Sequence, residues 1–186
     1  MLLVDNIFSK DELNTIKDSV LKSQPYIDTA LGRLMTVYLK DALSSKTIDK
    51  LNNIVKNLTN PYLKIGGVTY VEYNLLYGVP NLPPHFDGDS TDLIINVQLE
   101  SNTQWDLGLD LETYRLKDNC ALIFNPNEQI HWRVHKKFYD GEYVKMLFIR
   151  LSNPDNPSDY SHLRYSQNHA IFKDVKEFRD SLKSKN

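Results

Sequence analysis

The residues between positions 77 and 99 include the side chains of this sequence that are best suited to bind a metal. His85 and Asp87 stand two positions apart, shortly before a mainly apolar run at 93–99. In an extended backbone, side chains two positions apart point to the same side, so the imidazole and the carboxylate can converge on one point. Both groups are common ligands of divalent transition metals, and the pair therefore predicts two thirds of a metal site.

A third ligand for such a site must come from another strand. Two imidazoles and one carboxylate that leave the other coordination positions open form the facial triad of non-haem Fe(II) sites. The remaining histidines are His131, His135, His162 and His169. We favour His131, which follows the strand-like run at 120–124 after a tight turn, and keep His135 as the alternative. The other two lie in the polar tail.

The second half of the chain is expected to position these ligands on short strands. After Gly66 and Gly67 the sequence is rich in β-branched and aromatic residues, and short turn-forming segments divide it. Strands are expected at 68–77, 93–99, 107–111, 120–124, 129–134 and 143–151. Several short strands without helices between them predict a mainly β domain of the sandwich or jelly-roll type.

Residues 1–65 are expected to form a helical buttress on one face of the β core at 66–152. A short strand at 2–8 is followed by Ser9 and Glu12, which have the spacing of a capping box, so a helix is expected from 10 to about 23. A second helix is expected at 47–58, and a short strand at 36–39. The tail at 153–186 is expected to end in a helix at 173–183.

Composition favours one globular domain that stays in the cytoplasm. The chain has 186 residues, of which 41% are hydrophobic and 25% charged, and its formal net charge is −2. A single cysteine fits a reducing compartment, and no apolar run is long enough to cross a membrane. The slightly acidic balance disfavours nucleic acid as a partner, although Arg133, Lys136 and Lys137 form a small basic cluster.

The order of these features resembles a known enzyme family. His-Phe-Asp at 85–87 before an apolar strand, a second histidine after a strand that ends in Phe124, and a basic residue on the following strand resemble the prolyl-hydroxylase-like branch of the 2-oxoglutarate and Fe(II)-dependent dioxygenases. The opening segment at 2–16 is similar to the strand and capped helix with which many of these domains begin. The resemblance implies a double-stranded β-helix, Fe(II) held by His85, Asp87 and His131, and 2-oxoglutarate and O₂ as co-substrates, with ascorbate as an auxiliary reductant.

The resemblance also implies a cation for the far carboxylate of 2-oxoglutarate. The candidates are Lys145 and Arg150 on the expected strand at 143–151. We favour Lys145, because a turn at 140–141 would return Arg150 to the level of His131, whereas the far end of the co-substrate should lie nearer the turn. Arg150 remains the alternative, since it belongs to an Arg-x-Ser pattern that the wider superfamily also uses.

Three further polar residues are candidates for contacts with the co-substrate. Tyr77 occupies a place where the resembled family often has a tyrosine whose hydroxyl reaches 2-oxoglutarate. Asn96 and Gln98 alternate along the strand at 93–99 and would share its inner face. A bound dicarboxylate would satisfy polar groups inside the barrel.

The sequence thus predicts an oxygenase that couples oxidative decarboxylation of 2-oxoglutarate to hydroxylation of a substrate. The resemblance alone suggests a peptide or protein substrate, with peptidyl proline as its target. The alternative is a cupin-like jelly roll that binds a non-redox metal, or a non-catalytic binding module. Specificity is expected to reside in the segments at 28–42, 87–92 and 152–166, and Trp105 and Trp132 are candidates for either the core or a substrate platform.

Overall fold

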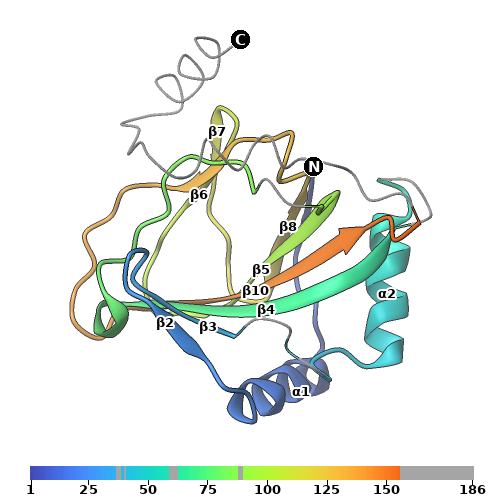
Figure 1. The fold of residues 1–186 in the computed structure, drawn as a ribbon, viewed down its shortest axis with the longest axis horizontal. Coiled ribbons are helices and arrows are strands. Elements are labelled where there is room, and N and C mark those ends of the chain that lie inside the picture. Colours follow the sequence, from blue (N-terminus) through green and yellow to red (C-terminus); the bar gives the residue numbers. More distant parts are fainter. Residues whose placement is uncertain (37–38, 40, 59–62, 88–89, 156–186) are drawn as a thin grey trace.

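Two antiparallel sheets pack face to face in the computed structural model, which describes residues 1–36, 39, 41–58, 63–87 and 90–155 (Figure 1). In spatial order, the larger sheet consists of β1 (Leu2–Val4), β8 (Cys120–Phe124), β5 (Leu93–Ser101), β10 (Tyr143–Ser152), β4 (Lys64–Asn74), β3 (Arg33–Thr36) and β2 (Tyr26–Asp28). The smaller sheet consists of β7 (Glu112–Tyr114), β6 (Leu107–Leu109) and β9 (His131–Arg133). The sequence-based prediction of a jelly-roll type of fold, with mostly antiparallel sheets and few helices, agrees with this arrangement.

Two helices cover the face of the larger sheet that points away from the smaller one (Figure 1). Helix α1 (Lys10–Leu21) begins with the predicted capping box, in which Ser9 and Glu12 each bond to the other's backbone N–H. Helix α2 (Ser45–Val55) is capped by the Ser44 side chain. Ile16 of α1 and Leu51 of α2 are fully buried against the aliphatic residues of the sheet. Both helices predicted in the first 65 residues are present, and each ends a few residues before its predicted end; the same part of the chain also contributes β1, β2, β3 and the start of β4 to the larger sheet.

The two faces of the larger sheet differ in character. The long neighbouring strands β5 and β10 pair in an antiparallel register, for example Ile95 with Ile149 and Asn96 with Phe148. Ile95 and Ile149 pack toward the helices, whereas Asn96 and Phe148 face the space between the sheets. Alternation along each strand thus separates an aliphatic core from a second interior that also contains polar groups.

One predicted strand ends earlier than expected. The strand expected at 68–77 runs from Lys64 to Asn74, and a short 3₁₀-helix, η1 (Leu75–Tyr77), follows it. The Asn74 side-chain oxygen accepts a hydrogen bond from the Leu76 backbone N–H at 2.9 Å, which caps that turn. The prediction was therefore wrong for residues 75–77, and Tyr77 does not lie in a strand.

A hairpin occupies part of the segment at 28–42 that was expected to be a specificity loop. Strands β2 and β3 pair with each other, and β3 extends the larger sheet by pairing with β4, for example Met35 with Val71. These strands have only three and four residues, so a period-two pattern does not reveal them. The strand expected at 36–39 overlaps β3 only at Thr36, and residues 37 and 38 lie outside the described residues.

Turns with a positive φ shorten other predicted strands. The strand expected at 107–111 ends at Leu109, because Asp110 has a φ of 55° and turns the chain into β7, which was not predicted. The opening strand ends at Val4, before Asn6 with a φ of 52°. The strand expected at 129–134 is limited to β9. The tail helix expected at 173–183 lies outside the described residues, and none of the helices in the described part is long and apolar enough to span a membrane.

Candidate metal centre

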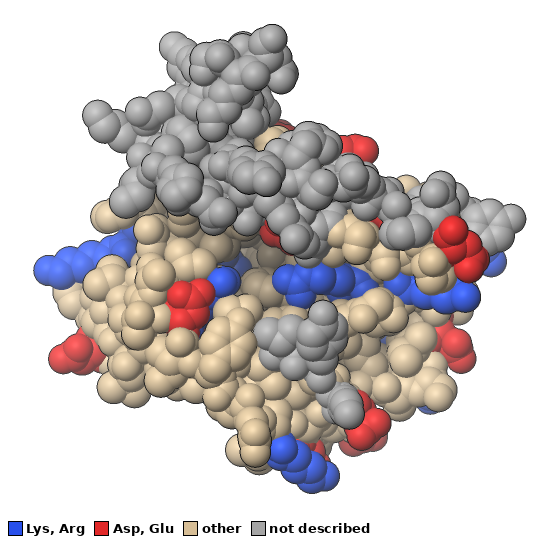
Figure 2. All heavy atoms as spheres, viewed as in Figure 1, with Lys and Arg blue, Asp and Glu red and all other residues tan. Residues whose placement is uncertain are grey.

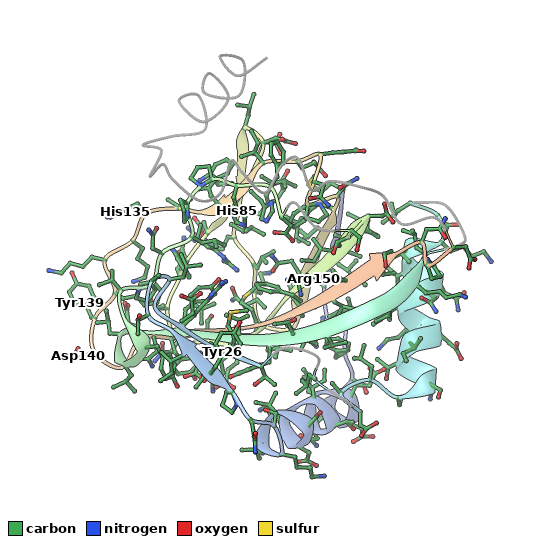
Figure 3. The ribbon with its side chains drawn as sticks, in the orientation of Figure 1. Tyr26, His85, His135, Tyr139, Asp140 and Arg150 are labelled. Atoms are coloured by element: carbon green, nitrogen blue, oxygen red, sulfur yellow. The ribbon has the colours of Figure 1, made fainter. Side chains whose placement is uncertain are left out.

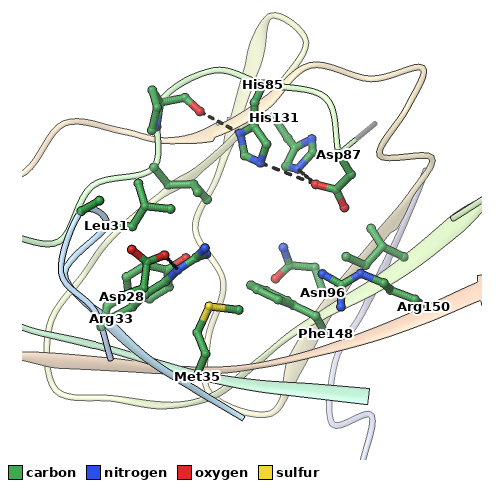
Figure 4. Close-up of a pocket in the computed structure, with 15 residues that line it drawn as sticks. Asp28, Leu31, Arg33, Met35, His85, Asp87, Asn96, His131, Phe148 and Arg150 are labelled. Carbon is green, nitrogen blue, oxygen red and sulfur yellow. Dashed lines mark hydrogen bonds and ion pairs between the residues drawn. The ribbon is translucent and has the colours of Figure 1, made fainter. Parts of the chain in front are cut away.

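His85, Asp87 and His131 converge at one wall of the space between the two sheets (Figure 4). One ligand atom from each side chain lies within 4.8 Å of the other two. The Asp87 Oδ1 atom is 3.6 Å from His85 Nε2 and 3.3 Å from His131 Nε2. The side chains predicted to form a triad are therefore brought together, although they are 46 residues apart along the chain from first to last.

Backbone hydrogen bonds fix the positions of the three residues. His85 and His131 form an isolated antiparallel bridge, with N–O distances of 3.0 and 3.1 Å, and this bridge continues the pairing of the smaller sheet beyond β9. The Asp87 N–H donates to the Pro126 carbonyl at 3.1 Å. The ligand atoms thus project from a hydrogen-bonded framework, which limits the reorganisation that metal binding would require.

The two imidazoles are held with their Nε2 atoms available for coordination. His85 Nδ1 lies 2.8 Å from the Pro83 carbonyl oxygen, and His131 Nδ1 lies 3.2 Å from the Gln129 carbonyl oxygen. Since a carbonyl oxygen only accepts hydrogen bonds, each Nδ1 must carry the proton. In the neutral form of each ring the lone pair is then on Nε2, which is the nitrogen that faces Asp87 and that a metal ion would bind.

The electrostatic environment favours the protonation states that a metal ligand needs. Burial and the neighbouring His131 lower the pKa of His85, so its ring tends to be neutral. Burial alone would raise the pKa of Asp87, but hydrogen bonds and charge from the two histidines outweigh it and hold that pKa far below its usual range. A neutral imidazole and an ionised carboxylate are the coordinating forms of these groups.

The spacing of the three groups suits a single ion. Ligand atoms that bind one transition metal at about 2.0–2.2 Å and at right angles lie about 3 Å apart. The observed 3.3 and 3.6 Å separations from Asp87 approach this value, so small side-chain movements would complete the geometry. Two imidazole nitrogens and one carboxylate oxygen form the donor set of the non-haem Fe(II) triad, and the residues present therefore fit such a metal.

A cavity of about 460 Å³ opens in front of the triad. The residues that line it, apart from the triad, are Asp28, Ala30, Leu31, Arg33, Met35, Tyr73, Leu82, Pro83, Ile94, Asn96, Phe148 and Arg150. The face shown in Figure 2 is hollowed near its centre, with basic side chains at the edge of the hollow. Figure 4 shows Arg33 and Arg150 on opposite sides of the cavity, below the triad. The cavity is large enough for a small organic molecule.

The structure places the two candidate cations differently. Arg150 lines the cavity and donates a hydrogen bond to Thr69 Oγ1 at 2.9 Å. Lys145 does not line the cavity: its Nζ lies 3.5 Å from the Glu100 carboxylate and 4.5 Å from the centre of the Tyr143 ring. The cation at the cavity is therefore the residue that sequence reasoning ranked second.

The three polar candidates also have different environments. Asn96 lines the cavity, is buried, and has a side-chain oxygen without a hydrogen bond to any described residue. Gln98 is equally buried but donates to the Leu116 carbonyl at 3.0 Å and does not line the cavity. The Tyr77 hydroxyl donates to Glu72 at 3.4 Å, also away from the cavity lining. Of these three candidates, Asn96 alone lines the cavity with a buried side-chain atom that has no hydrogen bond to a described residue.

The alternative third ligand, His135, is exposed on the loop after β9 and does not line the cavity (Figure 3). His162 and His169 lie outside the described residues. Trp105 is buried in the core, with its ring centre 4.8 Å from that of Tyr73. Trp132 packs on Gly108, where an added Cβ would lie 2.1 Å from the indole. Neither tryptophan lines the cavity.

Sequence reasoning did not name Asp28, Arg33 or Tyr73 as site residues, although positions 28 and 33 lie in the segment 28–42 that was expected to determine specificity. The first two belong to the unpredicted hairpin of β2 and β3, and Tyr73 is one aromatic residue among several in β4. Apart from the proximity of an acid and a base at 28 and 33, no local pattern distinguishes them. Their role depends on the pairing of β3 with β4, which brings them to the cavity.

Comparison with known proteins gives matches at the level of structure. No family model and no curated protein matches the sequence. An oxidoreductase of the 2OG-Fe(II) oxygenase family from Burkholderia pseudomallei superposes with a TM-score of 0.63 at 9% identity, over 85% of this chain and 87% of that one. The non-haem α-ketoglutarate-dependent epimerase SnoN from nogalamycin biosynthesis gives 0.60 at 10% identity, over 81% and 77%.

A third match is HygX from Streptomyces hygroscopicus, whose structure contains nickel, 2-oxoglutarate and hygromycin B. Its TM-score is 0.57 at 10% identity, over 82% of this chain and 83% of that one. These matches do not single out the prolyl-hydroxylase-like branch. The chain therefore shares the jelly-roll-type fold of solved 2-oxoglutarate–Fe(II) oxygenases, and its cluster of two histidines and one aspartate lies at a cavity between the sheets.

Proposed function

We propose that this protein is a 2-oxoglutarate- and Fe(II)-dependent oxygenase that hydroxylates a small organic molecule. The observation that carries the proposal is the His85–Asp87–His131 cluster, with ligand atoms within 4.8 Å of one another, at the wall of a cavity that also contains Arg150. The fold shared with solved oxygenases of this family supports it. Peptidyl proline, which the sequence resemblance suggested, has no support from these matches.

His85 and His131 would hold the iron through Nε2, and Asp87 through its carboxylate. When bound, Fe(II) and 2-oxoglutarate supply the oxidation of a substrate by O₂, with decarboxylation of 2-oxoglutarate to succinate. The backbone carbonyls of Pro83 and Gln129 orient the two imidazoles by accepting their Nδ1–H groups. The chain thus contributes three ligands and leaves the other coordination positions to co-substrates.

Arg150 would bind the far carboxylate of 2-oxoglutarate, because its guanidinium lines the cavity and can make two parallel hydrogen bonds to a carboxylate. Thr69 accepts one of its N–H groups and so helps to orient the side chain. The buried Asn96 side chain, with its unpaired oxygen, would contact the bound ligands. Apolar neighbours such as Ile94 and Phe148 exclude water from this part of the cavity.

The strand topology supports a double-stranded β-helix as the finer description of the fold. After β4, the chain crosses to the smaller sheet at His85, returns to the larger one in β5, and crosses again for β6 and β7. It then alternates through β8, β9 and β10. Two opposed layers, with β8-β5-β10-β4 on one side and β7-β6-β9 and the bridge at His85 on the other, are the arrangement that this description requires.

Anaerobic reconstitution tests the proposal. The purified protein with Fe(II) and 2-oxoglutarate should show a weak visible charge-transfer band, and admission of O₂ should yield succinate. Arg150→Gln should weaken 2-oxoglutarate binding about 10- to 100-fold, because a charge-assisted carboxylate contact is lost, whereas the matched Lys145→Gln variant should bind normally. Absence of both the band and succinate in the unmodified protein would favour the cupin-like or non-catalytic alternative.

A further inference from the structure

The end of the cavity opposite Arg150 has a chemistry that the proposed co-substrate does not use. It is walled by the β2–β3 hairpin, which contributes Asp28 and Arg33 (Figure 4). Tyr73 of β4 also lines the cavity and interacts with Arg33. Because both guanidinium groups cannot contact the same end of one small dicarboxylate, the Arg33 end is available to a second molecule. In an oxygenase that molecule is the substrate to be hydroxylated.

Arg33 is held in a fixed orientation by Asp28. The two residues are cross-strand neighbours in the hairpin, and Arg33 Nε donates to Asp28 Oδ2 at 3.0 Å. Their side chains are only 17% and 24% exposed. No hydrogen bond of standard geometry joins the Arg33 Nη groups to a described residue, although the Tyr73 hydroxyl lies close to this guanidinium, so part of a planar set of donors remains for a ligand.

Tyr73 adds a second donor beside this guanidinium. Its side chain is fully buried and lines the cavity, and its hydroxyl has no hydrogen bond of standard geometry to any described residue. The hydroxyl lies close to Arg33: burial lowers the pKa of Arg33, but the interaction with Tyr73 helps to raise it. Buried hydroxyls normally have a partner. An acceptor on a bound molecule would supply it.

The charge at this end of the cavity favours an anion. Arg133 is buried and interacts electrostatically with Tyr73. It donates to the Trp105 carbonyl and, at 3.1 Å, to the Met146 sulfur. Among the described residues no carboxylate lies within 4.0 Å of Arg133, and Asp106, which acts on it at longer range, lies 3.7 Å from Arg115.

At the hairpin end, Arg33 and Asp28 both line the cavity with opposite charges, and Arg133, which does not line it, adds a positive charge that Asp106 offsets only at longer range. At the other end, the charges of Fe(II), Asp87, 2-oxoglutarate and Arg150 would cancel. A monoanionic substrate would thus balance the site, because a charge that is removed from water needs a partner of opposite sign.

Backbone contacts with neighbouring segments hold the β2–β3 hairpin in place. Gly32 at its tip has a φ of 59°, and an added Cβ there would lie 2.3 Å from the Val79 backbone. The Gly32 carbonyl accepts from Asn74 N–H at 3.3 Å, and the Leu31 carbonyl accepts from Asn81 N–H at 3.2 Å. The donors of Arg33 and Tyr73 are therefore preorganised before a ligand binds.

We propose that this end of the cavity is the substrate subsite, and that it binds the carboxylate of a small substrate through Arg33 and Tyr73. The inference rests on the proposed function, since it assigns the remaining space to the molecule that is oxidised. A volume of about 460 Å³ for the whole cavity fits a small acid beside 2-oxoglutarate, rather than a folded protein surface.

Calorimetry on the nickel-loaded protein with saturating 2-oxoglutarate tests the inference without turnover. The probes are the N-acetyl derivatives of the L-amino acids with uncharged side chains, which are monoanions, each compared with its primary amide, which has a similar shape but no charge. At least one acid should bind, and its amide should bind at least about 10-fold more weakly. Arg33→Gln should weaken binding of that acid about 10- to 100-fold, and Tyr73→Phe about 2- to 10-fold.

Two variants control this experiment. Arg33→Lys keeps the charge but not the planar donors, so it should recover part of the affinity that Arg33→Gln loses. Arg115→Gln removes an arginine with a largely exposed side chain, which should leave probe binding unchanged. Equal binding of acids and amides, undiminished binding by Arg33→Gln, or no acid bound by a protein that binds 2-oxoglutarate would each overturn the inference. If the unmodified protein does not bind 2-oxoglutarate, the proposed function fails, and the inference fails with it.

Discussion

The two faces of the larger sheet are built from the same strands but have different roles. Toward the helices, β5 and β10 present Ile95, Val97, Leu147 and Ile149. Toward the smaller sheet they present Ile94, Asn96, Phe148 and Arg150. Side chains of the first face are aliphatic and fully buried, whereas the second face mixes apolar groups with Arg150 and with Asn96, whose side-chain oxygen has no hydrogen bond to a described residue.

This difference separates stability from chemistry within one sheet. Burial of aliphatic side chains is the main source of favourable folding free energy, and the helix-facing side provides it without polar interruptions. Buried polar groups without partners cost stability, and two of the three such side-chain atoms among the described residues, in Tyr73 and Asn96, belong to residues that line the cavity, where a ligand could satisfy them. Substitutions on the helix-facing side should therefore mainly lower the free energy of unfolding, whereas substitutions on the cavity side should mainly weaken binding of the metal and the co-substrate.

The largest effect is expected on the cavity side, at the proposed metal ligands. Asp87→Ala removes the only carboxylate of the triad, and we expect Fe(II) affinity to fall about 100-fold or more, with loss of succinate formation. Titration with Fe(II) under anaerobic conditions measures the affinity. His135→Ala, at an exposed histidine outside the cavity, is the matched control, and similar losses in both variants would contradict the ligand assignment.

On the helix side, Leu147→Ala should lower stability without a loss of metal affinity. Leu147 is fully buried among aliphatic side chains, and its truncation leaves a cavity that should lower the free energy of unfolding by about 2–5 kcal/mol. Chemical denaturation measures this loss. At temperatures where the variant is folded, its affinity for Fe(II) and 2-oxoglutarate should equal that of the unmodified protein. A loss of metal affinity larger than the loss of stability would show that the two faces are not separate.

Asn96→Leu should raise the free energy of unfolding and weaken the binding of 2-oxoglutarate. The substitution keeps a similar size but removes a buried side-chain oxygen that has no hydrogen bond to a described residue, so unfolding of the metal-free protein should require about 1 kcal/mol more. Binding of 2-oxoglutarate should become weaker, because the side chain lines the cavity. Denaturation and calorimetry on the same preparation test both parts. Lower stability with unchanged binding would refute this role for Asn96.

The smallest effect is expected at the edge of the helical layer, where Glu12 of α1 pairs with Lys50 of α2. Burial opposes ionisation, but hydrogen bonds from Lys50 and Ser9 lower the pKa of Glu12 from 4.5 to about 2. Because the folded-state pKa is the lower one, the stabilisation is present at neutral pH and is lost as the pH falls from about 4.5 to 2.

Glu12→Gln should therefore destabilise the protein by about 0.5–1 kcal/mol at pH 7. The difference from the unmodified protein should shrink as the pH approaches 2. Denaturation curves at several pH values measure it. A difference that does not depend on pH would mean that the cap, and not the charge, provides the stabilisation.

Local patterns predicted much of the fold and the clustering of the proposed ligands. The strand at 120–124 matches β8, and the capping box correctly placed the start of α1. The His-x-Asp pair was recognisable because its residue types and spacing carry the chemistry in themselves. The ranking of Lys145 above Arg150 relied on distance from a turn and neglected strand parity. Position 150 shares its face with Phe148 at the cavity, whereas 145 has the parity of Leu147, which faces the helices.

The substrate end of the cavity was not predictable in this way. Asp28 and Arg33 become neighbours through a short hairpin, and they reach the cavity only because β3 pairs with β4. Pairing between segments about forty residues apart leaves no signature in either segment alone. Only the three-dimensional arrangement brings these residues to Tyr73.

A crystal structure with Mn(II) and N-oxalylglycine, a stable analogue of 2-oxoglutarate, tests the central claim most directly. We predict one metal ion bound by His85 Nε2, His131 Nε2 and the Asp87 carboxylate, with the far carboxylate of the analogue on Arg150. The hairpin end beside Arg33 should remain open to a second ligand. A metal bound through His135, or an analogue anchored by Lys145 or Arg33, would contradict this account of the site.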